Sequence, residues 1–442
     1  MLRFGTDGIR GDADRDLPTA HVRAVGRAAV RVLGTGEPFV IGRDTRLSGP
    51  RIEADLVAGI VAEGATAYTV GVLPTPGVAY LAATRSAPAA VISASHNPFA
   101  DNGIKFFDRS GHKPAREVEA ALESSIRDLI SEGGSTPDAS AVPVLHGGAE
   151  SYVAHLVSLL EGRSLNGLRV VVDAANGAAS EVAAVTLSAA GADVEVINAS
   201  PDGTNINEDC GSTHPEALQV EVKRTGAAAG LALDGDADRV LAVDESGAVV
   251  DGDQIMAITA LDLRERRLLR HGAVAVTVMS NLGLRSAMCA AGIDVVETDV
   301  GDRHVLAAMQ ERGLSLGGEQ SGHVIFGDMA TTGDGLLTGL MILDRMVRSG
   351  RPLSDLAGAM TRLPQVLESV RVPTRMDPDA IPALRALIEQ VEGRLGDRGR
   401  VLVRPSGTEP VVRVMAEAPT EEEAAEAVAE IRVAVEVAAR GT

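Results

Sequence analysis

Apolar runs and polar loops alternate along the chain in a pattern that recurs three times. Each copy begins with an apolar run, continues through a polar loop and an Ala-rich stretch that ends in glycine, and closes with a second apolar run. The copies begin at residues 39–44, 168–177 and 274–281. Glycine suits the left-handed conformation in which many helices end. Strands that alternate with helices predict parallel strand pairs covered by helices, and hence three similar α/β units.

The last stretch of the chain follows a different pattern. After residues 364–373 comes a helical segment, then two apolar runs at 400–405 and 411–419, and finally an acidic Ala-rich segment. This order predicts a smaller C-terminal α+β domain of the form β-α-β-β-α. We therefore expect three similar mixed-sheet α/β domains plus this smaller domain. The expected boundaries are 1–150, 151–250, 251–365 and 366–442.

Composition and charge narrow the class of protein. Hydrophobic residues make up 45% of the 442 residues but aromatic residues only 2%, so the cores must be built from Val, Leu, Ile and Ala. The net charge of −20 argues against a nucleic-acid partner, which would require a basic stripe. An anionic substrate must then be bound by a local cluster of Arg.

The cysteine content, the N-terminal residues and the lengths of the apolar runs predict a soluble cytoplasmic protein. The two cysteines, Cys210 and Cys289, lie far apart in the sequence, and we expect both to be buried, unreactive thiols in a reducing compartment. The N-terminal residues do not resemble a signal peptide. No apolar run approaches the roughly 18 residues that a membrane span needs.

A triplet of aspartates is the strongest local signal. The segment LDGDADRV (233–240) places Asp234, Asp236 and Asp238 at alternate positions between two apolar runs. If the segment is extended, all three carboxylates point to the same side and need a cation. Hard oxygen ligands favour Mg²⁺. An EF-hand loop does not fit, because Arg239 stands where that loop requires Gly. The alternative is a solvated acidic turn.

Two further segments carry groups suited to a phosphosugar. RPSGTEPVVRV (404–414) offers hydrogen-bond donors that could surround a phosphate, and its alternative is a plain hairpin turn. These donors are Arg404, Ser406, the amide of Gly407, Thr408 and Arg413. GGEQSGH (317–323) holds one carboxylate, and is either a clamp for sugar hydroxyls or an ordinary loop.

Three single residues, Arg10, His96 and His304, have side chains that suit more than one role. Arg10 in FGTDGIRG (4–11) either neutralises a phosphate or braces a strand. His96 suits a hydrogen bond that orders its loop, and His304 is a candidate second acid or base. No Gly-Lys pair occurs, which excludes the P-loop NTPases.

The segment AAVISASHNPFADNGIKFF (89–107) contains two candidate nucleophiles, Ser93 and Ser95. A serine hydroxyl is a weak nucleophile and needs a base, a metal or a covalent modification. Lys105 closes the segment, and it is one of only three lysines among 41 basic residues, which suggests a chemical reason for it. A phosphoserine beside Mg²⁺ can donate phosphate to an alcohol while Arg side chains hold a second phosphate.

The motifs taken together resemble those of the α-D-phosphohexomutase superfamily, in particular its phosphoglucosamine mutase branch. The resemblance covers the whole chain, and the motifs stand in the family's order: FGTDGIRG, SASHNP, DNGIKFF, DGTNINEDCGSTHPE, LDGDADR, GGEQSGH and RPSGTEPVVRV. It implies four domains around one central cleft, and commonly a homodimer. One departure is His304, where this branch is expected to have Tyr.

The resemblance also implies roles for individual residues. Ser95 matches the phosphorylated residue, whose phosphate completes the Mg²⁺ site with Asp234, Asp236 and Asp238. Lys105 matches the residue that transfers protons, and we place Arg10 in the catalytic set. Residues matched to substrate binding are Glu319 and Ser321 for the sugar, and Arg404, Ser406, Gly407, Thr408 and Arg413 for the phosphate.

The activity expected from the resemblance is interconversion of glucosamine 6-phosphate and glucosamine 1-phosphate. The reaction would use one Mg²⁺ per subunit and glucosamine 1,6-bisphosphate as the activating intermediate, and would supply UDP-N-acetylglucosamine for cell-wall synthesis. A phosphomannomutase/phosphoglucomutase is the enzymatic alternative. A Mg²⁺-dependent phosphatase is disfavoured, because three further domains make sense only where water must be excluded. A non-catalytic sugar-phosphate sensor is disfavoured by retention of the catalytic residues.

Overall fold

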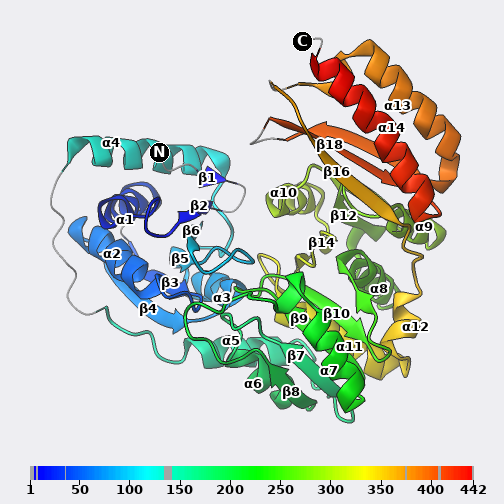
Figure 1. Cartoon of the computed structure of the whole chain (residues 1–442). Coiled ribbons are helices and arrows are strands. Elements are labelled where there is room, and N and C mark those ends of the chain that lie inside the picture. The colour runs from blue at the N-terminus through cyan, green and yellow to red at the C-terminus, as the bar shows by residue number, and fades with distance from the viewer. Residues whose placement is uncertain are drawn as a thin grey trace. The chain divides into compact units, whose positions relative to one another are not determined.

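The structure is a computed structural model that describes residues 4–5, 8–34, 36–133, 142–373, 376–406 and 410–440 (Figure 1). The chain divides into two compact units. The first contains residues 1–279 and 293–359, and the second contains residues 280–292 and 360–442. No helix in these described ranges is long and apolar enough to cross a lipid bilayer.

The first sheet has six strands in the order β1-β2-β6-β5-β3-β4. The strands are β1 (Phe4–Gly5), β2 (Gly8–Asp12), β3 (Phe39–Arg43), β4 (Ala67–Val72), β5 (Ala89–Ile92) and β6 (Asp101–Phe107). The accompanying helices are α1 (Thr19–Leu33), α2 (Gly49–Ala62), α3 (Thr75–Arg85) and α4 (Arg116–Glu132). Buried aliphatic residues of α1, α2 and α4 share one core with β3, β5 and β6, for example Val25, Leu56, Leu122 and Ile41.

The second sheet has the order β11-β10-β9-β7-β8. Its strands are β7 (Arg169–Asp173), β8 (Asp193–Ile197), β9 (Ala229–Leu233), β10 (Val240–Asp244) and β11 (Val249–Val250). The helices in this part of the chain are α5 (Gly148–Ser158), α6 (Val182–Ala189), the 3₁₀ helix η1 (Gly211–Thr213) and α7 (Glu216–Thr225).

The third sheet has the order β13-β12-β14-β15. Its strands are β12 (Ala273–Thr277), β13 (Asp294–Thr298), β14 (Leu316–Gly318) and β15 (Val324–Phe326). Around it in the sequence lie α8 (Gly252–Glu265), η2 (Arg270–Gly272), α10 (Asp302–Arg312), α11 (Gly335–Ser349) and α12 (Leu353–Ala357). The segment α9 (Leu282–Ala290) belongs to the second unit.

The three sheets repeat one topology. In each, the first strand of a common set of four is flanked by the second and third strands, both parallel to it, as β3 is by β4 and β5. The fourth strand then pairs antiparallel with the third, as β6 does with β5. The corresponding sets are β7, β8, β9 and β10, and β12, β13, β14 and β15. The prediction of three similar mixed-sheet α/β domains is confirmed.

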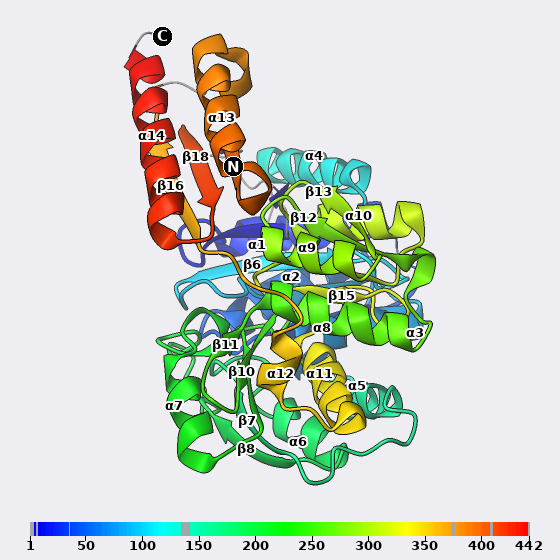
Figure 2. The same ribbon diagram turned by 90° about the vertical axis from the view of Figure 1, so that its right-hand side faces the viewer.

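The second unit contains the smaller antiparallel domain. Its sheet has the order β16-β18-β17, with β16 (Gln365–Arg371), β17 (Arg400–Pro405) and β18 (Val411–Glu417). The helices are η3 (Pro378–Ala380), α13 (Pro382–Leu395), η4 (Gly396–Arg398) and α14 (Glu421–Arg440). Helices α13 and α14 lie side by side against the sheet (Figure 2). Their apolar residues share a core with it, among them Leu384, Ile431 and Val414, so the predicted β-α-β-β-α domain is confirmed.

Candidate active site

In each of the three α/β domains, the loop that joins the third strand of the common set to the antiparallel fourth strand carries a candidate functional group. It holds Ser95 between β5 and β6, the three aspartates between β9 and β10, and Glu319 between β14 and β15. Ligand sites in α/β sheets commonly form beyond the carboxyl ends of parallel strands. The internal repeat therefore provides equivalent positions for three different chemical groups.

A buried arginine shapes the serine loop. Arg46 is fully buried, and its Nε donates to Asp44 Oδ2 at 2.8 Å. Its guanidinium also donates to four backbone oxygens of the loop, those of Ser95 (2.9 Å), Asn97 (2.8 Å), Asp101 (2.9 Å) and Pro98. Ser95 has a φ of +54°, a left-handed conformation that costs energy for a residue with a Cβ. The bonds from Arg46 compensate for that cost and fix the position of Ser95.

The two serines of this loop have different partners. Ser93 Oγ donates to Asp44 Oδ2 at 2.6 Å and accepts the backbone N–H of Ser95 at 2.9 Å. Ser95 Oγ donates to Asp234 Oδ2 at 2.6 Å. Ser93 therefore orders the loop, and Ser95 is the serine that faces the aspartate triplet.

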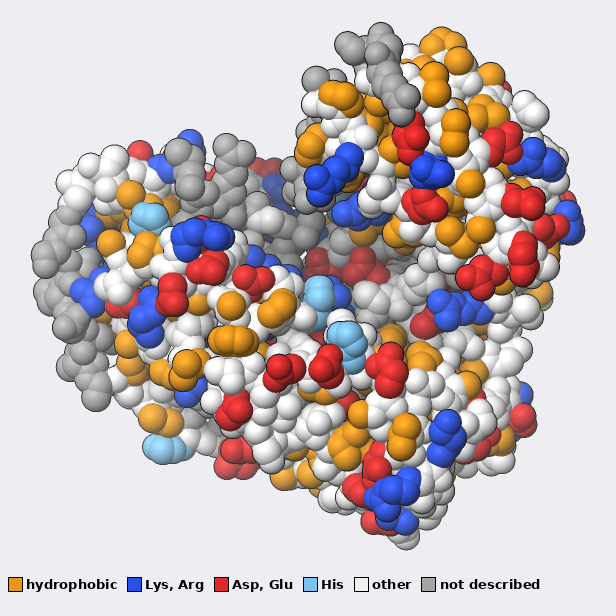
Figure 3. All heavy atoms as spheres, in the orientation of Figure 1, with side chains coloured by type: hydrophobic (Ala, Val, Ile, Leu, Met, Phe, Trp, Pro, Cys, Tyr) orange, Lys and Arg blue, Asp and Glu red, His pale blue; other side chains and the backbone are white. Residues whose placement is uncertain are grey.

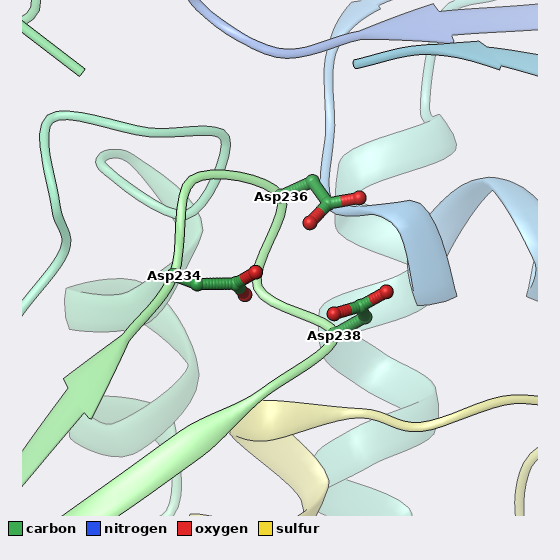
Figure 4. Close-up of side chains that lie close together, drawn as sticks. All are labelled: Asp234, Asp236 and Asp238. Atoms are coloured by element: carbon green, nitrogen blue, oxygen red, sulfur yellow. The ribbon is translucent and has the colours of Figure 1, made fainter. Parts of the chain in front are cut away.

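The three aspartates converge through a turn and not through an extended strand, which corrects the expected local geometry. Ala237 has a φ of +56°, and its N–H bonds to the backbone oxygen of Asp234 at 3.0 Å. This turn brings the three carboxylates toward one another (Figure 4). All three are buried, and one ligand oxygen from each lies within 4.8 Å of the others.

Lys105 supplies a positive charge to this cluster. Its Nζ lies 2.7 Å from Asp236 Oδ2 and 3.5 Å from Asp238 Oδ2, and its side chain is 1% exposed. Asp236 Oδ1 and Asp238 Oδ1 are buried and have no hydrogen-bond partner within the described structure. Buried carboxylate oxygens without partners are costly. The donor set of hard oxygens, two of them unsatisfied, therefore fits a divalent cation such as Mg²⁺.

Electrostatics separate the ionisation of two members of the triplet. Burial, followed by repulsion from Asp238 and Asp236, raises the pKa of Asp234 well above its usual range. Burial acts in the same direction on Asp238, but Lys105, then His323 and Arg239, outweigh it and lower the pKa of Asp238. Of these two carboxylates, Asp238 is the one more firmly held in its charged form.

Arg10 and Lys105 lie on the same face of the first sheet. Arg10 on β2 is the register partner of Gly103 on β6, and residues 103 and 105 share a face because side chains alternate along a strand. A Cβ at Gly103 would meet the backbone oxygen of Ile9 at 2.6 Å and Arg10 Cγ at 3.1 Å. Glycine there makes room for the Arg10 side chain, which lies against β6.

His96 is a neutral acceptor beside the serine. Its Nδ1 lies 3.2 Å from Arg239 Nη1 and 3.4 Å from Ser95 Oγ. Burial, then the charges of Arg239 and Arg10, lower the pKa of His96 to about 4. At neutral pH the ring is uncharged, and the expected loop-ordering role of His96 stays a prediction.

The GGEQSGH loop contributes a residue that we had not singled out from the sequence. His323 is buried, its Nδ1 lies 3.7 Å from Asp238 Oδ1, and its Nε2 accepts the backbone N–H of Gly333 at 3.2 Å. Glu319 Oε1 accepts the N–H of Gly301 at 3.1 Å, and Ser321 is exposed. The place of His323 at the end of this motif is the only signal in the sequence that marks it.

The expected phosphate-binding segment lies in the second unit and is described by itself. Arg404 on β17 is the register partner of Arg413 on β18, and Ser406 N donates to the backbone oxygen of Val411 at 2.9 Å. Two like charges directly opposite on one face repel each other, and an anion between them would relieve that repulsion. Gly407 and Thr408 lie outside the described residues.

His304 lies on α10, and its Nε2 is 3.5 Å from Nη2 of Arg116 at the start of α4. Its expected role as a second acid or base stays a prediction.

The two cysteines differ in exposure. Cys210 is buried, and burial raises the pKa of its thiol to about 12, which agrees with an unreactive role. Cys289 is exposed on α9, so the expectation that both thiols are buried is wrong for this residue. Helix α9 buries the face that carries Gly283, Leu284 and Met288, and Cys289 lies outside that face.

Comparison with protein families first defines the class. Four family models for phosphoglucomutase/phosphomannomutase match successive parts of the chain. They are α/β/α domain I at residues 1–132, domain II at 150–247, domain III at 251–363 and the C-terminal domain at 367–434. These matches, with the four-domain fold, place the chain in the class of α-D-phosphohexomutases.

Individual relatives give the branch. Phosphoglucosamine mutase of Moorella thermoacetica is 52% identical over 95% of this chain and 96% of its own length. Phosphoglucosamine mutase of Salinispora tropica is 50% identical, and the match covers 97% of each chain. The chain belongs to the phosphoglucosamine mutase family.

Solved structures agree with the fold. A phosphoglucomutase/phosphomannomutase family protein of Burkholderia thailandensis matches with a TM-score of 0.80 and 27% identity, over 98% of this chain and 97% of that one. N-acetylphosphoglucosamine mutase of Aspergillus fumigatus, in complex with GlcNAc-6P and magnesium, matches with a TM-score of 0.71 and 20% identity, over 99% and 96%. The second likeness shows the fold alone.

Proposed function

We propose that this protein interconverts glucosamine 6-phosphate and glucosamine 1-phosphate, and that Ser95 carries the phosphoryl group between them. The observation that carries the proposal is the buried cluster in which Ser95 Oγ lies 2.6 Å from Asp234 Oδ2. Asp236, Asp238 and Lys105 complete the same cluster. Relatives about 50% identical over nearly the whole chain support the choice of substrate.

The three aspartates are the residues that would hold one Mg²⁺ per subunit, with phosphorylated Ser95 as a further ligand. When bound, the cation stabilises negative charge on a phosphoryl group in transfer. Asp236 Oδ1 and Asp238 Oδ1, buried and without a hydrogen-bond partner among the described residues, support this assignment. Arg404, Ser406, Gly407, Thr408 and Arg413 are proposed to bind the phosphate that does not react, and Glu319 and Ser321 to contact the sugar.

The proton balance of one transfer suggests the role of Lys105. The substrate hydroxyl loses a proton as its oxygen bonds to phosphorus, and Ser95 Oγ gains one as its bond to phosphorus breaks. One exchangeable group near both oxygens is enough to balance the step, and the product is glucosamine 1,6-bisphosphate with a free serine. The reverse reaction at the other phosphate regenerates phosphoserine. We propose Lys105 as this group and Arg10 as a cation that stabilises the phosphate.

The remaining expectations also stand as proposals. The product would feed the synthesis of UDP-N-acetylglucosamine for the cell wall, in the cytoplasm, and the protein would form a homodimer. The alternative activity is that of a phosphomannomutase/phosphoglucomutase, because the two activities rely on the same catalytic residues.

The experiment that tests the proposal is a coupled assay of the purified protein with Mg²⁺ and a panel of hexose 6-phosphates. The panel contains glucosamine, N-acetylglucosamine, glucose and mannose 6-phosphates, and a trace of the matching bisphosphate primes each reaction. We expect the highest kcat/KM with glucosamine 6-phosphate. A higher value with glucose or mannose 6-phosphate would favour the alternative, and no turnover with any of them would favour a sugar-phosphate sensor.

A further inference from the structure

A threonine from the first domain holds the aspartate loop of the second. Thr75 is the first residue of α3, and its side chain is fully buried. Its backbone N–H donates to the backbone oxygen of Asp236 at 3.0 Å. Its hydroxyl donates to Asp236 Oδ2 at 2.6 Å. One residue thus fixes both the main chain and the carboxylate of Asp236.

The local sequence prepares Thr75 for this contact. The first N–H groups of a helix have no acceptor within the helix and must find one elsewhere. Pro74 precedes Thr75 in an extended conformation, with φ −48° and ψ 143°, and Pro76 follows it inside the helix. Because Thr75 is the first residue of α3, its N–H has no acceptor within the helix and can bond to the aspartate loop. The positive end of the helix dipole also favours a carboxylate there.

The hydroxyl determines which oxygen of Asp236 is left for a cation. Asp236 Oδ2 accepts from both Thr75 and Lys105, the latter at 2.7 Å. Asp236 Oδ1 is buried and has no hydrogen-bond partner in the part of the chain that the structure describes. Two donors on one oxygen restrict the rotation of the carboxylate and leave Oδ1 as the oxygen available to ligate a cation. Hydrogen bonds to a ligating carboxylate are known to tune metal affinity.

We propose that Thr75 is a positioning residue of the metal site and sets its affinity for the divalent cation through Asp236. This inference rests on the proposed function, because it requires that the three aspartates bind a cation. Thr75 would touch neither the cation nor the sugar, and it would act only through the carboxylate that it orients.

The test compares Thr75→Val with Thr75→Ser. Valine keeps the shape of threonine and removes the hydroxyl, whereas serine keeps the hydroxyl. Binding of Mn²⁺ to the full-length protein, measured without substrate from the EPR signal of free Mn²⁺, reports the metal site independently of turnover. We expect about 10–100-fold weaker binding for Thr75→Val and nearly normal binding for Thr75→Ser. The Mg²⁺ concentration for half-maximal activity should rise by the same factor in the valine variant.

Two controls make the result specific. Thr186 is also fully buried, but its hydroxyl donates to Val182 O of its own helix at 2.7 Å, so Thr186→Val should bind Mn²⁺ as the parent protein does. If Thr75→Val does not fold, Thr75→Ala against Thr75→Ser repeats the comparison with smaller side chains. Unchanged Mn²⁺ binding in Thr75→Val, or equal weakening in Thr186→Val, would overturn the proposal.

Asp236→Asn separates this inference from the proposed function. If Asp236→Asn loses Mn²⁺ while Thr75→Val keeps it, the metal site stands and the role of Thr75 is wrong. If Asp236→Asn and the parent protein bind Mn²⁺ equally, the metal site itself is wrong, and the role of Thr75 is wrong with it.

Discussion

At the scale of single residues, Ser95 and Ser93 differ in what their hydroxyls can reach. Ser93 Oγ is engaged by Asp44 and by the amide of Ser95, whereas Ser95 Oγ meets Asp234. A phosphate on Ser93 would displace the bonds that order the loop. A phosphate on Ser95 would instead be placed at the aspartate triplet. The contacts thus distinguish the two serines by chemistry and agree with the resemblance, which matched Ser95 to the phosphorylated residue.

We therefore expect a phosphate on part of the protein, located at Ser95 and not at Ser93. Ser95→Ala should lose nearly all mutase activity, because the group that carries the phosphoryl is gone. Intact-mass analysis and peptide mapping check the first point, and the coupled assay checks the second. Turnover of Ser95→Ala at about a tenth of the parent rate or better would contradict a covalent mechanism of this kind.

Lys105 provides a second prediction at this scale. Lysine and arginine both supply a positive charge, but only lysine readily releases and regains a proton. Lys105→Arg should therefore keep KM within a few-fold and lower kcat by about 10²–10⁴, the usual size of a general acid–base contribution. Steady-state kinetics at saturating Mg²⁺ measure both constants. Nearly normal turnover would reduce Lys105 to a counter-ion and direct attention to His323, which lies 3.7 Å from Asp238.

At the scale of elements, close helix packing holds the first domain together. The helices α1 and α2 cross at Gly26 and Gly59, where each backbone approaches the other. A Cβ at Gly26 would meet the backbone oxygen of Leu56 at 2.2 Å, and one at Gly59 would meet that of Arg23 at 2.1 Å. These two glycines are required by proximity, because a backbone oxygen cannot rotate away as a flexible side chain can.

Gly26→Ala should consequently destabilise the protein by about 1–3 kcal/mol, the usual cost of overpacking a closely packed interface. Gly393 in the helix α13 is a matched control, because a Cβ there would meet no other described part of the chain within 4 Å. At that position alanine should stabilise by about 0.5–1 kcal/mol, since it removes the entropic cost of a helical glycine. Thermal unfolding followed by circular dichroism measures both. A Gly26→Ala protein as stable as its parent would show that the two helices can move apart freely.

At the scale of the whole molecule, the net charge of −20 has the same sign as the charge of an anionic substrate, so the two repel each other. Acidic and basic side chains are interspersed over the described part of the face in Figure 3. Inside the first unit, the aspartate triplet concentrates negative charge with Lys105 as a close counter-ion. A bound cation would offset the repulsion that remains, and the effect should extend to the stability of the fold.

Mg²⁺ should therefore raise the midpoint of thermal unfolding, since a ligand that binds only the native state stabilises it. At about 100 times the dissociation constant the stabilisation is about 2.7 kcal/mol. Asp236→Asn is nearly isosteric, and in this variant Mg²⁺ should produce a much smaller shift and support less activity. Differential scanning calorimetry with Mg²⁺ and with EDTA measures the effect. Equal shifts in the two proteins would mean that the aspartates do not bind the cation.

Much of this protein was determined by local sequence pattern. The apolar runs at 39–44, 168–177 and 274–281 predicted the first strand of each repeat, and the terminal segment predicted the β-α-β-β-α domain. Such patterns depend on the periodicity of burial, which each segment carries by itself. The aspartate triplet could be read in the same way, because its spacing and residue type already indicated a cation.

The tertiary structure decided which partners each residue meets. Asp236 bonds to Thr75 across 161 positions of sequence, and Ser95 bonds to Asp234 across 139. No local pattern encodes such pairs, because they exist only once the domains pack against one another. The left-handed turn at Ala237 and the five hydrogen bonds donated by the Arg46 side chain also depend on the tertiary structure. Strain and burial of this kind are tolerated only where surrounding contacts compensate for them, and those contacts come from distant parts of the chain.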